Sequence, residues 1–162
     1  MKTLVIGLGT LVLVALGRPA LAQRCLSFRP PNPEMRRKYN FGAGVESDWT
    51  PGSRYQGVSP LAPAAIWEGE NLEVVPPRRL VQSFRALWSE DVKREGTSRV
   101  TWEIEPVGDS CRLTVVHDEL REGAHDELYG GWMMILSGLK TLLETGEQLT
   151  TPASLRFQGQ AA

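Results

Sequence analysis

The chain has 162 residues, of which 41% are hydrophobic and 23% are charged, as is typical of one globular domain with a hydrophobic core. The formal net charge is −1, which gives no general electrostatic attraction to nucleic acid or to an anionic membrane. The two cysteines, Cys25 and Cys111, are too few for a disulfide framework and lack the spacing of zinc ligands.

Residues 1–22 have the layout of a secretory signal peptide. Lys2 supplies a positive charge, an apolar stretch runs from Leu4 to Leu16, and Ala20-Leu21-Ala22 forms a small-x-small cleavage pattern. The apolar stretch is too short to span a bilayer, so we expect no stable membrane span in the mature chain. We expect an exported protein, periplasmic or secreted, if these residues act as a signal, and a cytoplasmic protein otherwise. Two other interpretations compete with this one. The segment could be a buried strand, or it could be a start region that does not belong with the domain that follows it.

Residues 23–98 alternate between connectors and short elements. Residues 23–33 form a Pro-rich connector, and the next ten residues fit a short helix because Pro33 suits a first turn and Gly42 follows the end. The basic run Arg36-Arg37-Lys38 should cover a solvated face of this helix. Further on we expect a strand entering a turn at Pro51-Gly52, a loop that becomes extended toward Trp67, two extended runs separated at Pro76-Pro77, and an exposed polar loop at 89–98.

The stretch 99–120 predicts a β-hairpin. Gly108-Asp109 lies between two alternating runs, as in a two-residue type II′ turn with glycine first. Counting outward from the turn opposes inner-face and outer-face residues in pairs. The inner pairs are Ile104 with Leu113, Trp102 with Val115 and Val100 with His117, and the outer pairs are Glu105 with Arg112 and Glu103 with Thr114.

The stretch 126–146 predicts one amphipathic helix of about five turns. Asp126 is the expected N-cap, Glu127 lies in the first turn, and Gly146 is the expected C-terminal stop. Apolar residues recur at helical spacing, at Leu128, Trp132, Ile135, Leu136, Leu139, Leu142 and Leu143. Residues 147–162 are polar without a period, which favours a disordered tail.

These elements together predict an α+β fold, a curved antiparallel sheet packed against one long C-terminal helix. Helix and curved sheet can enclose an apolar cavity. The candidates for its lining are Trp102, Val115, His117, Trp132, Ile135 and Leu136. The same residues could instead fill a solid core, and periodicity does not separate the two possibilities.

Four stretches of the chain resemble a known family. In order, these are FGAGVESDWTPGSRYQ, WEGENLEVVPPRRLVQSFR, SRVTWEIEPVGDSCRLTVVHDEL and GWMMILSGLKTLLETG. They are similar to bacterial proteins related to the C-terminal domain of the activator of heat-shock-protein-90 ATPase, within the START-like (SRPBCC) superfamily. The resemblance implies a helix-grip fold for residues 34–146. The eukaryotic relatives help the chaperone hydrolyse ATP, so the resemblance also implies a link to the stress response.

The N-terminal part departs from the family pattern. Family members begin with a long strand and a helix, where this chain has the signal-like stretch 1–22 and the connector 23–33. The first strand and helix of the START-like domain are therefore expected to be missing or replaced. A sheet edge left unpaired in this way would be prone to aggregation.

The tetrapeptide His-Asp-Glu-Leu occurs twice, at 117–120 and 125–128, and contains both histidines of the chain. The two histidines are eight positions apart, whereas a helical metalloprotease motif needs a spacing of four, so we predict no metal site. A retrieval signal is read only at a free C-terminus. We expect His117 to end a strand facing inward and the second copy to open a helix.

We therefore predict a non-enzymatic domain without catalytic residues, cofactor or metal. It would bind a hydrophobic small molecule in its cavity or modulate a chaperone-type protein partner, and it would not bind nucleic acid. The alternative is a small cavity enzyme, of hydrolase or lyase type, with His117 as its base. A partly solvated His117 at the rim of the fold is the simpler interpretation of that residue.

Overall fold

A single antiparallel sheet of seven strands forms the framework of the protein, in the order β1-β7-β6-β5-β4-β3-β2. The computed structural model describes residues 11–13, 33–108 and 110–152. The strands are β1 (Leu11–Leu13), β2 (Gly44–Ser47), β3 (Arg54–Val58), β4 (Trp67–Val75), β5 (Arg79–Ala86), β6 (Thr97–Val107) and β7 (Ser110–Asp118). The helices are α2 (Pro33–Arg37), α3 (Glu90–Lys93), the 3₁₀ helix η1 (Asp126–Leu128) and α4 (Trp132–Thr145).

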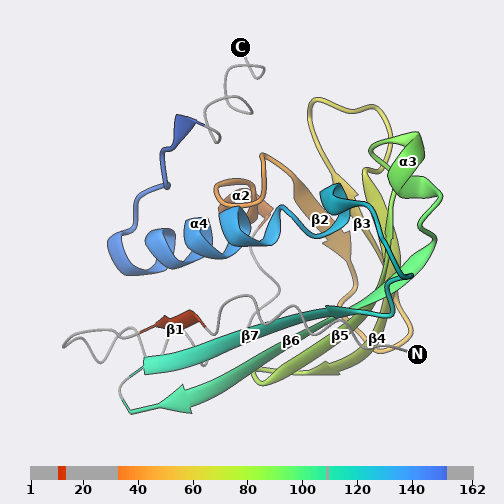
Figure 1. The fold of residues 1–162 in the computed structure, drawn as a ribbon. Helices are drawn as coiled ribbons and strands as arrows, with labels where there is room; N and C mark the ends of the chain where they lie inside the picture. Colours follow the sequence, from red (N-terminus) through yellow and green to blue (C-terminus); the bar gives the residue numbers. More distant parts are fainter. Residues whose placement is uncertain (1–10, 14–32, 109, 153–162) are drawn as a thin grey trace.

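The sheet curves, and α4 lies across its concave side with α2 beside it (Figure 1). We call the side that faces α4 the inner face and the opposite side the outer face. The predicted α+β class and the helix-grip arrangement are confirmed. None of the helices in the described part of the chain is long and apolar enough to cross a membrane.

The β6–β7 hairpin has the predicted register. Its pairs include Ile104 with Leu113, Trp102 with Val115, Val100 with His117, Glu105 with Arg112 and Glu103 with Thr114. Gly108 has φ +55°, a positive value that a primed two-residue turn requires at its first position. Strict alternation fixed this register because a slip of one residue would expose every buried side chain on the hairpin.

The break between the two extended runs is also confirmed. Strand β4 ends at Val75, β5 begins at Arg79, and the peptide bond between Pro76 and Pro77 is cis. Proline cannot donate a ladder hydrogen bond, so two prolines in succession end the pairing. The turn closes with the amide of Arg78 donating to the carbonyl of Val75 at 2.8 Å.

A compact part of the core forms where β2, β3 and β4 meet. The buried cluster consists of Ala43, Val45, Tyr55 and Trp67. Gly57 pairs with both Val45 and Trp67 in the ladders, and the Trp67 ring fills the position that a Cβ on Gly57 would occupy. The absence of a side chain at Gly57 thus makes room for the largest member of the cluster.

The expectation of an exposed loop at 89–98 is wrong. This segment contains α3, with Ser89 as its N-cap accepting a hydrogen bond from the amide of Val92 at 3.4 Å. Val92 has no exposed surface and packs with Ala86 and Leu128. A single apolar residue in a polar run has no hydrophobic periodicity, so the sequence pattern did not predict the burial of Val92.

The expected five-turn helix from 126 to 146 is divided in two. Residues 126–128 form η1, and α4 starts only at Trp132, after Gly130 and Gly131. Asp126 is not the N-cap: His125 is, and its Nδ1 accepts a hydrogen bond from the amide of Glu127 at 3.3 Å. Two adjacent glycines weaken helix formation because each loses much backbone entropy. Gly146 ends α4 with φ +80°, as predicted.

Most of the N-terminal and C-terminal predictions fall outside the described residues. Of the signal-like segment, the described Leu11–Leu13 form β1, which pairs antiparallel with β7 through Leu11 and Leu113. The connector 23–33 is described only at Pro33, and the tail 147–162 only as far as residue 152. The signal, the connector and the tail therefore remain predictions.

Cys111 on β7 is buried and disulfide-bonded.

We predict that Gly57→Ala destabilises the protein by roughly 1–3 kcal/mol, because the new methyl group must displace the Trp67 ring in a close-packed cluster. Gly44→Ala is the matched control, since Gly44 lies on the neighbouring strand and a Cβ there would meet only ordinary contacts of 3.6 Å or more. Urea unfolding of both variants measures the difference. An equal effect of the two substitutions would contradict this account of Gly57.

Candidate functional site

The inner face brings together several of the residues predicted to line a cavity. Trp102 on β6 and Trp132 at the start of α4 meet edge to face, with ring centroids 5.3 Å apart. The ring of His117 on β7 lies 6.0 Å from that of Trp132, centroid to centroid. Val115 lies opposite Trp102 in the ladder. On α4, Leu136 is buried and Ile135 is partly buried.

His117 forms a continuous chain of hydrogen bonds between α4 and the sheet. The indole Nε1 of Trp132 donates to His117 Nδ1 at 3.2 Å, so Nδ1 carries no proton and Nε2 carries one. Nε2 then donates to Ser98 Oγ at 2.8 Å, and Ser98 Oγ donates to the carbonyl of Phe84 at 3.1 Å. The partners assign the tautomer, and both ring nitrogens are used.

The surroundings of His117 keep its imidazole neutral. Burial lowers the pKa of His117 to about 4, against a smaller opposing effect of the Asp118 charge. Asp118 does not hydrogen-bond His117: its carboxylate lies on the outer face and accepts two hydrogen bonds from Arg99, at 2.9 and 2.7 Å. A base needs a free lone pair directed at a substrate, and here Trp132 occupies the only one.

Several side chains around Trp102 on the inner face are only partly buried. Val100 and His117 are buried, at 2% and 4% exposed, whereas Trp102, Val115, Trp132 and Ile135 keep an intermediate exposure although they face each other across the helix and sheet. The indole Nε1 of Trp102 is itself buried and has no hydrogen-bond partner among the described residues. A buried donor without an acceptor is uncommon in folded proteins and costs free energy.

Sequence reasoning missed Arg36. In the basic run, Arg37 and Lys38 are exposed as predicted, but Arg36 is partly buried, and its Nε is shielded from solvent without a hydrogen-bond partner. Burial lowers the pKa of Arg36, and the nearby Tyr39 and Tyr55 are its electrostatic neighbours. The expectation that the whole run covers a solvated face is therefore wrong for this residue.

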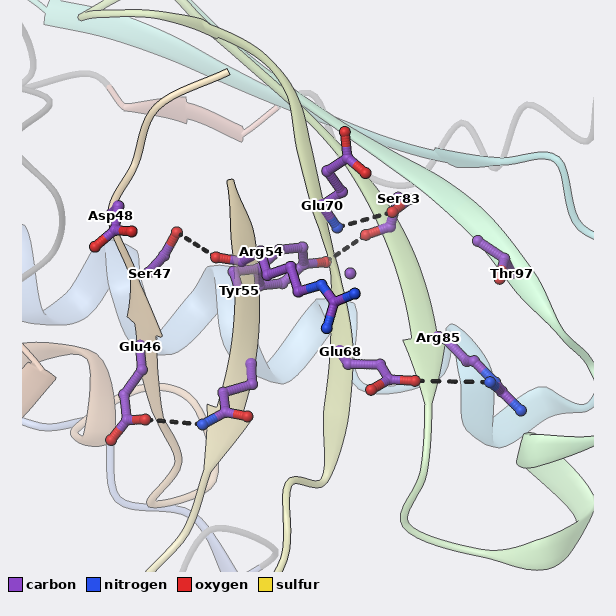
Figure 2. Close-up of a pocket in the computed structure, with 12 residues that line it drawn as sticks. Glu46, Ser47, Asp48, Arg54, Tyr55, Glu68, Glu70, Ser83, Arg85 and Thr97 are labelled. Atoms are coloured by element: carbon purple, nitrogen blue, oxygen red, sulfur yellow. Dashed lines mark hydrogen bonds and ion pairs between the residues drawn. The ribbon is translucent and has the colours of Figure 1, made fainter. Parts of the chain in front are cut away.

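Two hollows on the outer face were also not foreseen. Figure 2 shows the larger one, of about 680 Å³, which polar side chains of β2, β3, β4 and β5 surround. Within it, Gln56 donates to Glu46 at 2.9 Å and Arg85 pairs with Glu68 at 3.6 Å. A second hollow of about 500 Å³ includes the ion pairs of Arg79 with Glu73 and of Arg99 with Asp118. Both are open and charged, which does not suit an apolar ligand.

The two His-Asp-Glu-Leu copies have separate structural roles. His117 faces inward from β7, while His125 caps η1. Within the described ranges, no group of three or more His, Cys, Asp or Glu side chains could hold a metal ion. The two copies of the tetrapeptide therefore share no chemical role in the structure.

Comparison with known proteins identifies the family of the chain and structures of similar fold. The family model described as Activator of Hsp90 ATPase homolog 1-like protein matches residues 32–144. The crystal structure of CalU16 from Micromonospora echinospora is similar with a TM-score of 0.60 and 22% identity, covering 88% of this chain and 78% of that one. No curated protein matches the chain.

Two further structures share the fold. An HSP90 activator from Plasmodium falciparum has a TM-score of 0.53 and 18% identity, over 69% of this chain and 81% of that one. DynU16, from the dynemicin biosynthetic locus, has a TM-score of 0.56 and 20% identity, over 80% of this chain and 45% of that one. At these identities the likeness shows the fold alone.

We predict that the protein loses stability as the pH falls from 7 to 5. The pKa of His117 is depressed in the folded state, so the unfolded chain, with a histidine pKa near 6.5, binds more protons over this range. The expected loss from this group is about 2 kcal/mol. Urea unfolding at pH 7, 6 and 5 measures it.

His117→Gln should weaken this pH dependence, and His125→Gln is the control because it replaces the other histidine of the chain. A full pH dependence in His117→Gln, or its loss in His125→Gln, would contradict the assignment to His117.

Proposed function

Because the chain belongs to the family of Activator of Hsp90 ATPase homolog 1-like proteins, we propose that it is a non-enzymatic binding domain. Its ligand is a small apolar molecule held between α4 and the inner face of the sheet. The site is the partly open region around Trp102, with Val115, Trp132 and Ile135 as its apolar walls.

The unpartnered indole N–H of Trp102 carries this proposal. Its burial removes it from water, and no acceptor compensates it in the described part of the chain. A ligand with a carbonyl or ether oxygen would supply that acceptor and regain the free energy lost by burying the donor. The two edge-to-face indoles of Trp102 and Trp132 supply an apolar surface for the body of the ligand.

The role of His117 supports binding over catalysis. A histidine that acts as a base would need a free nitrogen and an orienting carboxylate, whereas His117 is neutral and bonded at both nitrogens. Its hydrogen bonds instead hold the first turn of α4 at a fixed position over the sheet. We therefore assign His117 to the support of the site and not to a reaction.

A second candidate function is the modulation of a chaperone-type protein partner. The observation that favours it is the charged, open hollow on the outer face, which has the polar character of a transient protein interface. The family description, and the similar HSP90 activator from Plasmodium falciparum, point in the same direction. This surface lies on the opposite side of the sheet from Trp102, so the two functions can be tested separately.

We predict that 2-acetylnaphthalene raises the melting temperature of the protein more than 2-ethylnaphthalene, which has a similar shape but no carbonyl. Trp102→Phe should abolish the difference, because phenylalanine keeps an aromatic ring but has no N–H to donate. Trp88→Phe is the matched control, since Trp88 is 40% exposed. Thermal unfolding with each probe measures the shifts.

No stabilisation by either probe would overturn the ligand-binding proposal. Equal shifts that Trp102→Phe leaves unchanged would overturn the role of the indole N–H. An increase in the ATPase rate of an Hsp90-type chaperone that survives Trp102→Phe, without any probe binding, would favour the partner function.

We further propose that the protein is exported after cleavage behind Ala22, which would remove β1 and leave β7 as an edge of the mature sheet. The signal-like pattern of residues 1–22 supports this, and so does the disulfide of Cys111. Structural disulfides persist in the periplasm and outside the cell, whereas the cytosol keeps thiols reduced. The only other cysteine of the chain is Cys25, which would be the third residue of the mature protein.

We predict that N-terminal sequencing of protein recovered from cells carrying the full chain gives Gln23 as the first residue. A reductant should lower the stability of this protein by roughly 2–4 kcal/mol, the usual contribution of one disulfide. Cys111→Ser is the control, because a variant without the disulfide should not respond to the reductant. An intact Met1 together with free thiols would overturn export.

A further inference from the structure

A cation without a counter-ion lies on the inner side of the fold. Arg36 belongs to α2, and its Nε is buried without a hydrogen-bond partner. Its electrostatic neighbours are Tyr39, which lies against Gly138 of α4, and Tyr55, which belongs to the core cluster of the inner face. Arg36 therefore lies close to side chains that contact α4 and belong to β3.

The part of the chain that the structure describes offers this cation no carboxylate. Arg36 forms no salt bridge with any described residue, and no acidic side chain contributes to the electrostatic effects on it. The segments 1–10, 14–32 and 153–162 contain no Asp or Glu. The remaining acidic residue outside the described ranges is Asp109, in the turn between β6 and β7. A desolvated charge without a partner is costly, so such charges are normally paired in folded proteins.

The two neighbouring tyrosines fit an anion better than a cation. Burial raises the pKa of Tyr39 and of Tyr55, so both hydroxyls stay neutral and keep their protons to donate. Tyr55 already donates to the carbonyl of Ser83 at 2.7 Å. The Tyr39 hydroxyl is an electrostatic neighbour of the guanidinium, so it is available as a second donor beside it.

We propose that Arg36 binds the acidic group of an apolar acid, a carboxylate, sulfonate or phosphate, with the Tyr39 hydroxyl as a second donor. This inference rests on the proposed function, because it places the ligand on the same inner side of the sheet and names its chemical class. An arginine can donate two parallel hydrogen bonds to such a group, which favours oxyanions over other acceptors.

A simpler possibility is that Arg36 only covers apolar surface with its aliphatic stem and directs its head group to solvent. The two readings differ in what removal of the charge does. If the charge is an unpaired site for an anion, Arg36→Met should keep or raise the melting temperature of the free protein, and it should weaken the binding of acids selectively. If the arginine only packs against apolar surface and reaches water, the protein should not distinguish acidic ligands from neutral ones through this residue.

The experiment uses two fluorescent probes that share one aromatic body. These are N-phenyl-1-naphthylamine, which is neutral, and 8-anilinonaphthalene-1-sulfonate, which carries the acidic group. The wild-type full chain should bind the sulfonate roughly tenfold more tightly than the neutral probe, as expected for one charge-assisted contact. Arg36→Met should abolish this preference and leave the affinity for the neutral probe unchanged, and Tyr39→Phe should reduce it in part.

Arg37→Met is the matched control, because Arg37 is the next residue of α2 and is exposed. It changes the net charge by the same amount and should preserve the preference for the sulfonate. Equal loss in Arg36→Met and Arg37→Met would show a general charge effect and overturn the site. Displacement of the sulfonate by inorganic phosphate alone would overturn the assignment to an apolar acid.

The outcomes also separate this inference from the proposed function. Binding of both probes with equal affinity, unaffected by Arg36→Met, would overturn the acid site and leave the apolar ligand site intact. Failure of both probes to bind would overturn both proposals. If Arg36→Met does not fold, Arg36→Gln gives the same test with a polar residue that can be accommodated at a partly buried position.

Discussion

The hydrogen bond from the Trp132 indole to His117 fixes the position of α4, and with it the shape of the inner face. A helix on a sheet can slide, because apolar packing has little directional preference. Here a chain of three directional hydrogen bonds runs from Trp132 through His117 and Ser98 to the carbonyl of Phe84. It holds the first turn of the helix over β5, β6 and β7, so the rest of α4 follows from that anchor.

The same anchor explains why the inner face is not uniformly packed. Near His117 the side chains are closely buried, and the edge-to-face contact of His117 with Phe84 at 5.5 Å, centroid to centroid, continues that packing. Four residues after Ser98 on the same strand, Trp102 meets Trp132 edge to face. The Trp102 N–H beside this contact is buried without a partner among the described residues.

The sequence predicts the hairpin well because its structure depends on one strict period. A strand with alternating apolar residues has one register that buries them all, so Trp102, Val115 and His117 could be placed on one face from the letters alone. The start of α4 was placed wrongly because the apolar stripe continues through Gly130 and Gly131, where backbone entropy interrupts the helix. Arg36 was missed because its surroundings include Tyr55 of β3, and its neighbour Tyr39 lies against α4, and both β3 and α4 are distant from it along the chain.

The distribution of polar groups separates the two faces of the sheet in kind. On the outer face most charged side chains pair with one another, as Arg79 does with Glu73 and Glu103, and such exposed pairs add little stability. The Nε of Arg112 on that face is nevertheless buried without a partner among the described residues. On the inner face the indole Nε1 of Trp102 and the Nε of Arg36 are buried and have no hydrogen-bond partner among the described residues. A core that served stability alone would gain by replacing either group with an apolar side chain of similar size. The proposed ligand would supply the acceptors that these two groups lack among the described residues.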